Sequence, residues 1–312
     1  MLKATGVVTA GVDTLGGTAS GVATPGAKIY DDRACTLGEG ALWHPQRQQL
    51  FWFDILGNRL LTRTEGARTR AWYFDEHVSA AGWIDHDILL IASESGLYRF
   101  DLDSAEREPV CELEADNLMT RSNDGRADPW GGFWIGTMGK AAEPDAGAIY
   151  RYYRGVLRRL IAPLTIPNAI CFSPDGRYAY FADTAKGAIW RLALESEHGW
   201  PSGEPELFVD CRREGVNPDG AVVDSEGRLW NAQWGASRVA CYDAKGQFIT
   251  AIPFPASQVS CPAFGGADFS RLFVTSAREG LSNEVLREQP KAGCTFVVGT
   301  EVRGRAEPRV YL

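Results

Sequence analysis

One short pattern recurs six times along the chain at intervals of about 40 to 50 residues, and this period limits the folds open to the sequence. Each copy begins with a polar residue, continues with an apolar run that ends four residues later, and passes through a turn into a second apolar run. In the copy at 216–234, Asp219 precedes the apolar run 221–223, and the turn 224–227 follows. The six polar residues, which we name the anchor residues, are Glu39, Ser79, Asn123, Asn168, Asp219 and Ser260.

The apolar runs predict β-strands that are joined by tight turns. The second strand of each copy is expected at 50–53, 88–92, 133–135, 178–181, 228–230 and 272–275. A third run follows at 59–62, 96–100, 148–152, 188–192, 238–242 and 295–298. Three or four strands in each copy at this period are typical of a propeller. The sequence therefore predicts an all-β fold, a six-bladed β-propeller with four-stranded antiparallel blades around a central channel. A two-sheet sandwich is the alternative, and it would require the six copies to be similar by accident.

The two ends of the expected domain offer strands that close the ring. A ring of sheets leaves unpaired edges unless its first and last blades share strands. We expect residues 29–32, or the last residues of the chain at 309–312, to complete the final blade. The propeller is expected to be a single domain over 28–312. Residues 1–27, rich in Gly, Thr and Ala, are a poor match to a signal peptide. They are predicted to be a mobile or loosely ordered N-terminal extension, or the product of a start codon assigned too early.

Charge and cysteine usage exclude some partners and compartments. A net charge of −8 argues against nucleic acid and anionic membrane surfaces as partners, because both select basic patches. The seven cysteines are scattered and never spaced as CxxC, which favours a reducing cytoplasm over a disulfide framework or a zinc knuckle. No apolar run approaches the roughly 20 residues of a membrane helix.

Four of the anchor residues carry oxygen ligands and are expected to meet. The innermost strand of each propeller blade runs along the channel, so equivalent positions converge at one end of the axis. Glu39, Asn123, Asn168 and Asp219 would supply two carboxylates and two amide oxygens, which suit Ca²⁺, Mg²⁺, Mn²⁺ or Zn²⁺. Two carboxylates neutralise one divalent ion, and four protein oxygens leave room for water or substrate. Taken singly, the strings around Asn123 and Asp219 also fit turns, but their shared register favours a site.

Other catalytic chemistries find little support. The chain has no G-x-S-x-G string. Two of its four histidines, His44 and His86, fall in predicted turns, which leaves a Ser–His–Asp site without a clear base. Asp101-Leu102-Asp103 lacks the glycine that an EF-hand loop requires.

Five strings, found in order between residue 35 and about residue 285, resemble the SMP-30/gluconolactonase family, also called the regucalcin family. The strings are LGEGALWHP (37–45), RSNDGRADPWGGFWIGTM (121–138), IPNAICFSPDG (166–176), NPDGAVVDSEGRLWNAQWG (217–235) and CPAFGGAD (261–268). The resemblance implies a six-bladed propeller, and the family that it points to includes metal-dependent sugar lactonases.

The same resemblance implies roles for individual residues. Glu39, Asn168 and Asp219 match metal ligands, with Asp219 also the candidate catalytic base. Asn123 matches a substrate contact beside the metal or a water-bridged ligand, and Arg121 matches a position that binds the hydroxyls or carboxylate of a sugar.

Two further features are a loop that the resemblance implies and one position at which the sequence differs from the usual family residue. The segment 139–147 would be a lid, with Glu143 as a substrate contact. Ala169 departs from the glycine that the family usually has after Pro-Asn, and its methyl should be tolerated if the backbone there is extended.

The sequence therefore predicts a metal-dependent lactonase in the cytoplasm that opens a pentono- or hexonolactone to its aldonic acid. The cofactor is expected to be one divalent cation, Ca²⁺, Zn²⁺, Mn²⁺, Mg²⁺ or Fe²⁺. The partner is a small-molecule sugar lactone, with no nucleic acid and no membrane. Three alternatives stay open: a calcium-binding regulatory protein without turnover, a hydrolase of phosphotriesters, and a binding module without catalysis.

Overall fold

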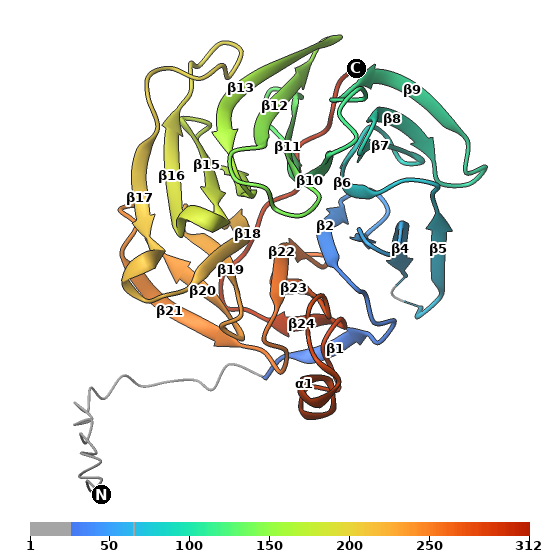
Figure 1. The fold of residues 1–312 in the computed structure, drawn as a ribbon, viewed down its shortest axis with the longest axis vertical. Coiled ribbons are helices and arrows are strands. Elements are labelled where there is room, and N and C mark those ends of the chain that lie inside the picture. Colours follow the sequence, from blue (N-terminus) through green and yellow to red (C-terminus); the bar gives the residue numbers. More distant parts are fainter. Residues whose placement is uncertain (1–25, 65) are drawn as a thin grey trace, which may run out of the picture.

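The computed structural model describes residues 26–64 and 66–312, which form six four-stranded antiparallel sheets arranged around a central axis (Figure 1). The inner strands are β2 (Gly38–His44), β6 (Val78–Trp83), β10 (Thr120–Ala127), β14 (Pro167–Phe172), β18 (Asn217–Val223) and β22 (Val259–Gly265). Each inner strand contacts the next around the ring, and β22 contacts β2. This closed cycle confirms the predicted six-bladed propeller.

The middle strands of the blades lie where the apolar runs predict them. The second strands are β3 (Gln49–Asp54), β7 (Ile88–Ser93), β11 (Phe133–Gly139), β15 (Tyr178–Asp183), β19 (Leu229–Trp234) and β23 (Arg271–Ser276). The third strands are β4 (Arg59–Arg63), β8 (Gly96–Asp101), β12 (Gly147–Tyr153), β16 (Ala188–Ala193), β20 (Arg238–Tyr242) and β24 (Thr295–Gly299). Nearly all of their residues are buried or half-buried, because both faces of a blade pack against neighbouring blades.

Apart from β1, which was expected at 29–32, the outer strands are the elements that the sequence did not reveal. They are β5 (Thr69–Tyr73), β9 (Arg107–Glu112), β13 (Val156–Leu164), β17 (Glu206–Asp210), β21 (Phe248–Pro253) and, in the sixth blade, β1 (Lys28–Asp31). These strands are largely exposed and short, and charged or polar residues interrupt or flank their apolar residues. Short helices η1 (Thr184–Lys186), η2 (Cys211–Arg213) and α1 (Asn283–Glu288) complete the fold. No helix within the described ranges is long and apolar enough to cross a membrane.

Ring closure uses the first of the two strands that were expected to provide it. Strand β1 pairs antiparallel with β24, with Lys28 opposite Val297 and Ile29 opposite Phe296. The last residues of the chain form no strand; they cross the ring instead, with Val310 N–H donating to the Trp83 carbonyl and Tyr311 N–H to the Gly131 carbonyl. The predicted extension at 1–27 falls mainly outside the described residues, and the single domain over 28–312 stays a prediction.

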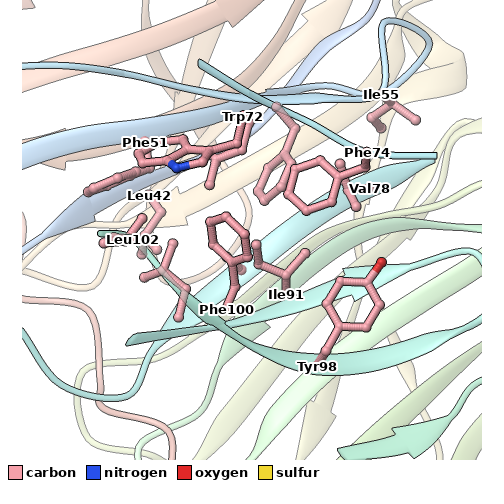
Figure 2. Packing of buried hydrophobic residues seen from close by; sticks show 14 of the residues in the cluster. Leu42, Phe51, Ile55, Trp72, Phe74, Val78, Ile91, Tyr98, Phe100 and Leu102 are labelled. Atoms are coloured by element: carbon pink, nitrogen blue, oxygen red, sulfur yellow. The ribbon is translucent and has the colours of Figure 1, made fainter. Parts of the chain in front are cut away.

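Aromatic side chains fill the spaces between blades. Figure 2 shows the cluster between the first two blades, where Phe51, Trp72 and Phe74 of the first blade meet Ile91 and Phe100 of the second. The rings of Trp72 and Phe100 pack edge to face with centroids 5.8 Å apart. Such a pair contributes about 0.5–1.5 kcal/mol beyond the area it buries. Since the blades share no strands, apart from closure of the sixth by β1, this packing is a main source of their cohesion.

His44, which was expected in a turn, is instead the last residue of β2 and is fully buried. Its Nε2 lies 2.9 Å from the Asp85 carbonyl oxygen, which only accepts, and its Nδ1 lies 3.2 Å from the Arg47 N–H, which donates. The ring is therefore held neutral, with its proton on Nε2. Burial lowers the pKa of His44 from 6.5 to about 4.

The His44 environment predicts a loss of stability in mild acid. Between pH 6.5 and 4 the unfolded chain binds a proton at His44 that the folded protein does not, so the free energy of unfolding falls as the pH falls. From pH 7 to pH 5 this contribution is roughly 1–2 kcal/mol. Urea denaturation at the two pH values should show a smaller decrease for His44→Gln than for the wild type. His198→Gln is the control, because His198 packs against Tyr153 and makes no contact with His44. An equal reduction of the decrease in both variants would contradict the assignment to His44.

Candidate functional site

Each inner strand carries a β-bulge, and the bulge lies at or beside the anchor residue. The register shifts at Glu39/Leu42 in β2, Val78/Ala80 in β6, Ser122/Gly125 in β10, Asn168/Cys171 in β14, Pro218/Ala221 in β18 and Val259/Pro262 in β22. A bulge inserts an unpaired residue and redirects the side chains around it. The anchor residues therefore mark the points at which the inner strands depart from the regular ladder, all near the same end of the ring.

Four anchor residues, Glu39, Asn123, Asn168 and Asp219, line one cavity of about 370 Å³. Each is only 4 to 7% exposed. Arg121 lines the same cavity and is also buried. The structure thus brings together five of the six residues predicted for the site, although their roles stay predictions.

The other two anchor residues have a structural task. The Ser79 hydroxyl donates to Ser122 Oγ at 2.8 Å, and the Ser260 hydroxyl donates to the Gly38 carbonyl. Both bonds join the inner strands of neighbouring blades. The same sequence position therefore serves as a link between blades where it is serine.

The carboxyl groups of Glu39 and Asp219 are held in an unfavourable environment for charge. Burial raises the pKa of Glu39 well above its ordinary value, and the charges of Asp219 and Asp124 raise it further. Burial likewise raises the pKa of Asp219, followed by the charge of Asp124. The charge of Arg121 offsets these effects only in small part. Two carboxylates that share a cavity in this way are stabilised when a cation binds between them.

A chain of hydrogen bonds fixes the orientation of the Asn168 amide. The Thr184 hydroxyl donates to the Pro218 carbonyl at 2.7 Å, so its oxygen accepts the bond from Asn168 Nδ2 at 2.8 Å. Asn168 Oδ1 then faces the other way, where it accepts from Asn123 Nδ2 at 3.0 Å. Because an amide oxygen has two lone pairs, Asn168 Oδ1 keeps one for a further partner.

Asn123 and Arg121 form a second, linked unit on β10. Arg121 Nη1 donates to Asn123 Oδ1 and to the Ser122 carbonyl, both at 2.9 Å. The oxygen of Asn123 accepts from the guanidinium of Arg121, whose positive charge opposes a cation on the same oxygen. Its Nδ2 donates to Asn168 Oδ1 and to the Pro167 carbonyl. This arrangement suits a residue beside a cation better than a direct ligand.

Glu143 is the one predicted site residue that the structure places apart from the others. It lies in the loop after β11, where its carboxylate accepts from the Ala141 N–H at 3.1 Å. Lys140, Ala141 and Ala142 of that loop line the cavity, but Glu143 is not among the lining residues. Its role as a substrate contact stays a prediction.

Sequence reasoning missed three polar residues in or beside the cavity. Asp124 follows an anchor residue and is buried, with its Oδ2 accepting from the Ile170 N–H at 2.7 Å. Glu279 and Thr184 line the cavity from segments that follow the second strands of their blades. The string Asn123-Asp124-Gly125 gave a signal for Asp124 that was assigned to a turn, whereas no local pattern marks the other two.

The donor set fits a hard divalent cation. Across 26–64 and 66–312, no group of three or more His, Cys, Asp or Glu side chains could hold a metal, so Asn168 would have to supply the third ligand. Glu39 Oε2 accepts a 3.2 Å bond from the Gly40 N–H, and the described residues place no lysine or arginine in an ion pair with Glu39 or Asp219. Two carboxylates and one amide oxygen are hard donors, and these two carboxylates have no described lysine or arginine as counter-ion. Such a set matches the preference of Ca²⁺, Mg²⁺ or Mn²⁺.

Ala169 corrects an expectation about the backbone beside Asn168. The backbone there is not extended: φ is +56°, in the left-handed region. The equivalent residue after Glu39 is Gly40 at φ +57°, where an added Cβ would meet the Ser79 carbonyl oxygen at 2.2 Å. Ala169 therefore accepts backbone strain of about 1–2 kcal/mol to present Asn168.

This strain can be measured with two matched alanine substitutions. Ala169→Gly and Ala182→Gly each remove a fully buried methyl and loosen the unfolded chain, but only the first relieves a left-handed alanine. The free energy of unfolding, measured with urea, should be about 1–2 kcal/mol higher for Ala169→Gly than for Ala182→Gly. Equal values for the two variants would show that the strain is absent.

Comparison with known proteins places the chain among lactone-cleaving and calcium-binding relatives. The family model described as the SMP-30/gluconolactonase/LRE-like region matches residues 37–278. L-arabinolactonase from Azospirillum brasilense is 37% identical over 289 residues, which cover 91% of this chain and 95% of that protein. The 6-deoxy-6-sulfogluconolactonase of Pseudomonas putida is 34% identical and covers 87% and 94%. A crystal structure from Agrobacterium tumefaciens, described as the calcium-binding protein regucalcin, matches with a TM-score of 0.90 and 41% identity, covering 93% of this chain and 98% of that one.

Proposed function

The chain belongs to the SMP-30/gluconolactonase/LRE-like family, and from this premise we propose that its cavity uses one divalent cation to hydrolyse a pentono- or hexonolactone to the aldonic acid. The chain is a lactone-hydrolysing enzyme, as its similarity to L-arabinolactonase and 6-deoxy-6-sulfogluconolactonase supports. The observation that supports a cation is the pair of buried carboxyl groups, Glu39 and Asp219, which share one cavity and form no ion pair with a described lysine or arginine. The calcium-binding description of a relative points to a divalent ion but does not identify it.

Glu39, Asn168 and Asp219 are the proposed ligands. Their set joins two carboxylates to one amide oxygen whose direction the Thr184 bond determines. When bound, the cation would polarise the lactone carbonyl, lower the pKa of a water and stabilise the developing oxyanion.

The protein side chains then have separate tasks. Asp219 is the proposed base that takes a proton from the attacking water. The water oxygen bonds to the carbonyl carbon, the bond from that carbon to the ring oxygen breaks, and the ring oxygen receives a proton. Arg121 and Asn123 would hold the sugar hydroxyls so that the carbonyl stays in place. Glu143 would join them if the loop 140–146 carries its carboxylate over the cavity.

Asp219→Asn tests the base and ligand role without changing the size of the side chain. We expect kcat/KM to fall at least about 10³-fold, because both the charge that binds the cation and the proposed base are lost. A pH-drop assay on a panel of pentono- and hexonolactones, after chelation and add-back of each cation, provides the measurement. Asp243→Asn, in a turn of the same blade outside the cavity, is the control and should retain the wild-type rate.

The same panel separates the alternatives. Full activity of Asp219→Asn would contradict the mechanism. Tight calcium binding without turnover of any lactone would favour a regulatory protein. With phosphotriesters added to the panel, faster cleavage of these than of lactones would favour a phosphotriester hydrolase.

The raised pKa values of Glu39 and Asp219 predict that cation affinity depends on pH. Protons stay on these carboxyls at pH values where ordinary carboxyls are ionised, so they compete with the cation. Raising the pH should therefore tighten binding by up to about tenfold per pH unit for each proton displaced. Calorimetric titration of the chelated protein with Mn²⁺ at several pH values measures this slope. Affinity that is constant from pH 5 to pH 8 would contradict the assignment.

A further inference from the structure

Arg126 lies on β10, below the cavity, and bonds three separate parts of the chain. Its Nε donates to the Ile170 carbonyl and its Nη2 to the Ala221 carbonyl, both at 3.0 Å. Its Nη1 forms an ion pair with Glu307, and both side chains are more than nine-tenths buried. Arg126 does not line the cavity, so it has no direct access to a ligand there.

The two carbonyls that Arg126 bonds belong to the strands of the proposed ligands. Ile170 follows Asn168 by two residues on β14, and Ala221 follows Asp219 by two residues on β18. Both carbonyls therefore lie in or beside the bulge that presents the ligand. Arg126 itself lies three residues after Asn123.

These bonds matter because β10, β14 and β18 belong to three different sheets. No ladder of backbone hydrogen bonds fixes the distance between neighbouring inner strands, so side chains must do so. Asp124 reinforces the bond to β14, since its Oδ2 accepts from the N–H of the same Ile170. Together, Arg126 and Asp124 engage both backbone groups of that residue.

Glu307 keeps the guanidinium of Arg126 stable in the protein interior. It belongs to the segment after β24 that crosses the far mouth of the channel, drawn in dark red in Figure 1. Trp83 Nε1 donates to the Glu307 carbonyl at 2.7 Å, which fixes the segment against the second blade. Burial alone would lower the pKa of Arg126, but the charges of Glu307 and Asp124 help to raise it above its ordinary value, so the side chain stays charged.

We propose that Arg126 is a positioning residue for the cation site: by bonding the strands of Asn168 and Asp219 at once, and with Glu307 as its counter-ion, it sets the spacing of the two ligands. This inference rests on the proposed function, because it assumes that the two residues hold a cation. Residues that orient ligands from outside the metal site typically change metal affinity about 10- to 100-fold when they are replaced.

The test compares Arg126→Met with Arg151→Met in the full-length protein. Arg151 is a matched control because, like Arg126, it is a buried arginine in an ion pair, here with Asp128 at 2.6 Å. Unlike the partners of Arg126, Asp128 belongs to the same blade as Arg151, so this ion pair joins no two inner strands. Each variant is chelated and titrated with Mn²⁺ by calorimetry, and its free energy of unfolding is measured without cation. We expect both variants to lose stability, while only Arg126→Met loses Mn²⁺ affinity, by roughly 10- to 100-fold.

Kinetics supply a second readout that a general loss of stability would not produce. At saturating Mn²⁺, Arg126→Met should lower kcat about tenfold and leave the KM for the lactone within about threefold, because Arg126 is outside the cavity. If Arg126→Met does not fold, Arg126→Lys replaces it: the single ammonium cannot reach acceptors on two strands and Glu307 together, so Mn²⁺ affinity should still fall at least about fivefold.

Each outcome decides the proposal. Wild-type affinity in the Arg126 variants, or an equal loss in Arg151→Met, overturns the positioning role while the proposed function stands. A wild-type protein that turns over lactone but binds no cation overturns both the cation site and the role of Arg126. Loss of Mn²⁺ affinity and kcat confined to the Arg126 variants supports the inference.

Discussion

One extra residue in each inner strand is the constraint on which the rest of the site depends. Without a bulge, successive side chains of an inner strand would point to opposite faces of the sheet in strict alternation. With it, Glu39 and Asn168 are the last paired residues before their bulges, and Asp219 lies within its bulge. All three side chains line one cavity. The backbone must accommodate this, through Gly40 at one bulge and through left-handed Ala169 at another.

The site is also built against the electrostatic preference of the protein interior. Burial raises the pKa of Glu39 and of Asp219, and the charge of Asp124 raises both pKa values further. All three carboxyl groups are almost fully buried. The scaffold tolerates this arrangement because aromatic packing between the blades, as in the cluster around Trp72 and Phe100, stabilises the ring independently of the axis. A rigid ring can then hold like charges together in one cavity, as the proposed cation site requires.

The sequence predicted those parts of the molecule that repeat. Anchor residues recur in register because the inner strands share one environment, and the middle strands are apolar because blades cover both of their faces. The outer strands other than β1 were not predicted, since solvent on one face interrupts the apolar pattern; the exposed β5 and β9 are examples. Resemblance to a family gave a predicted role for Arg121, which lines the cavity. Thr184 and Glu279 reach the cavity only through tertiary structure, which no local pattern records. The strain at Ala169 was missed because Asn168 was placed in a regular strand, although the usual glycine of the family at this position, like Gly40 after Glu39, is a signal of a left-handed backbone.

Strand β1 pairs with β24, so the first strand of the ring that leaves the ribosome has its partner among the last to be made. Glu307 lies later still, so during synthesis Arg126 has no counter-ion until almost the entire chain has emerged. Blades can form one by one as neighbouring strands pair, whereas completion of the ring needs contacts of very large sequence separation, which form slowly. The ring is therefore expected to close after its blades have formed, when β1 and the segment around Glu307 reach partners that lie far away in the sequence.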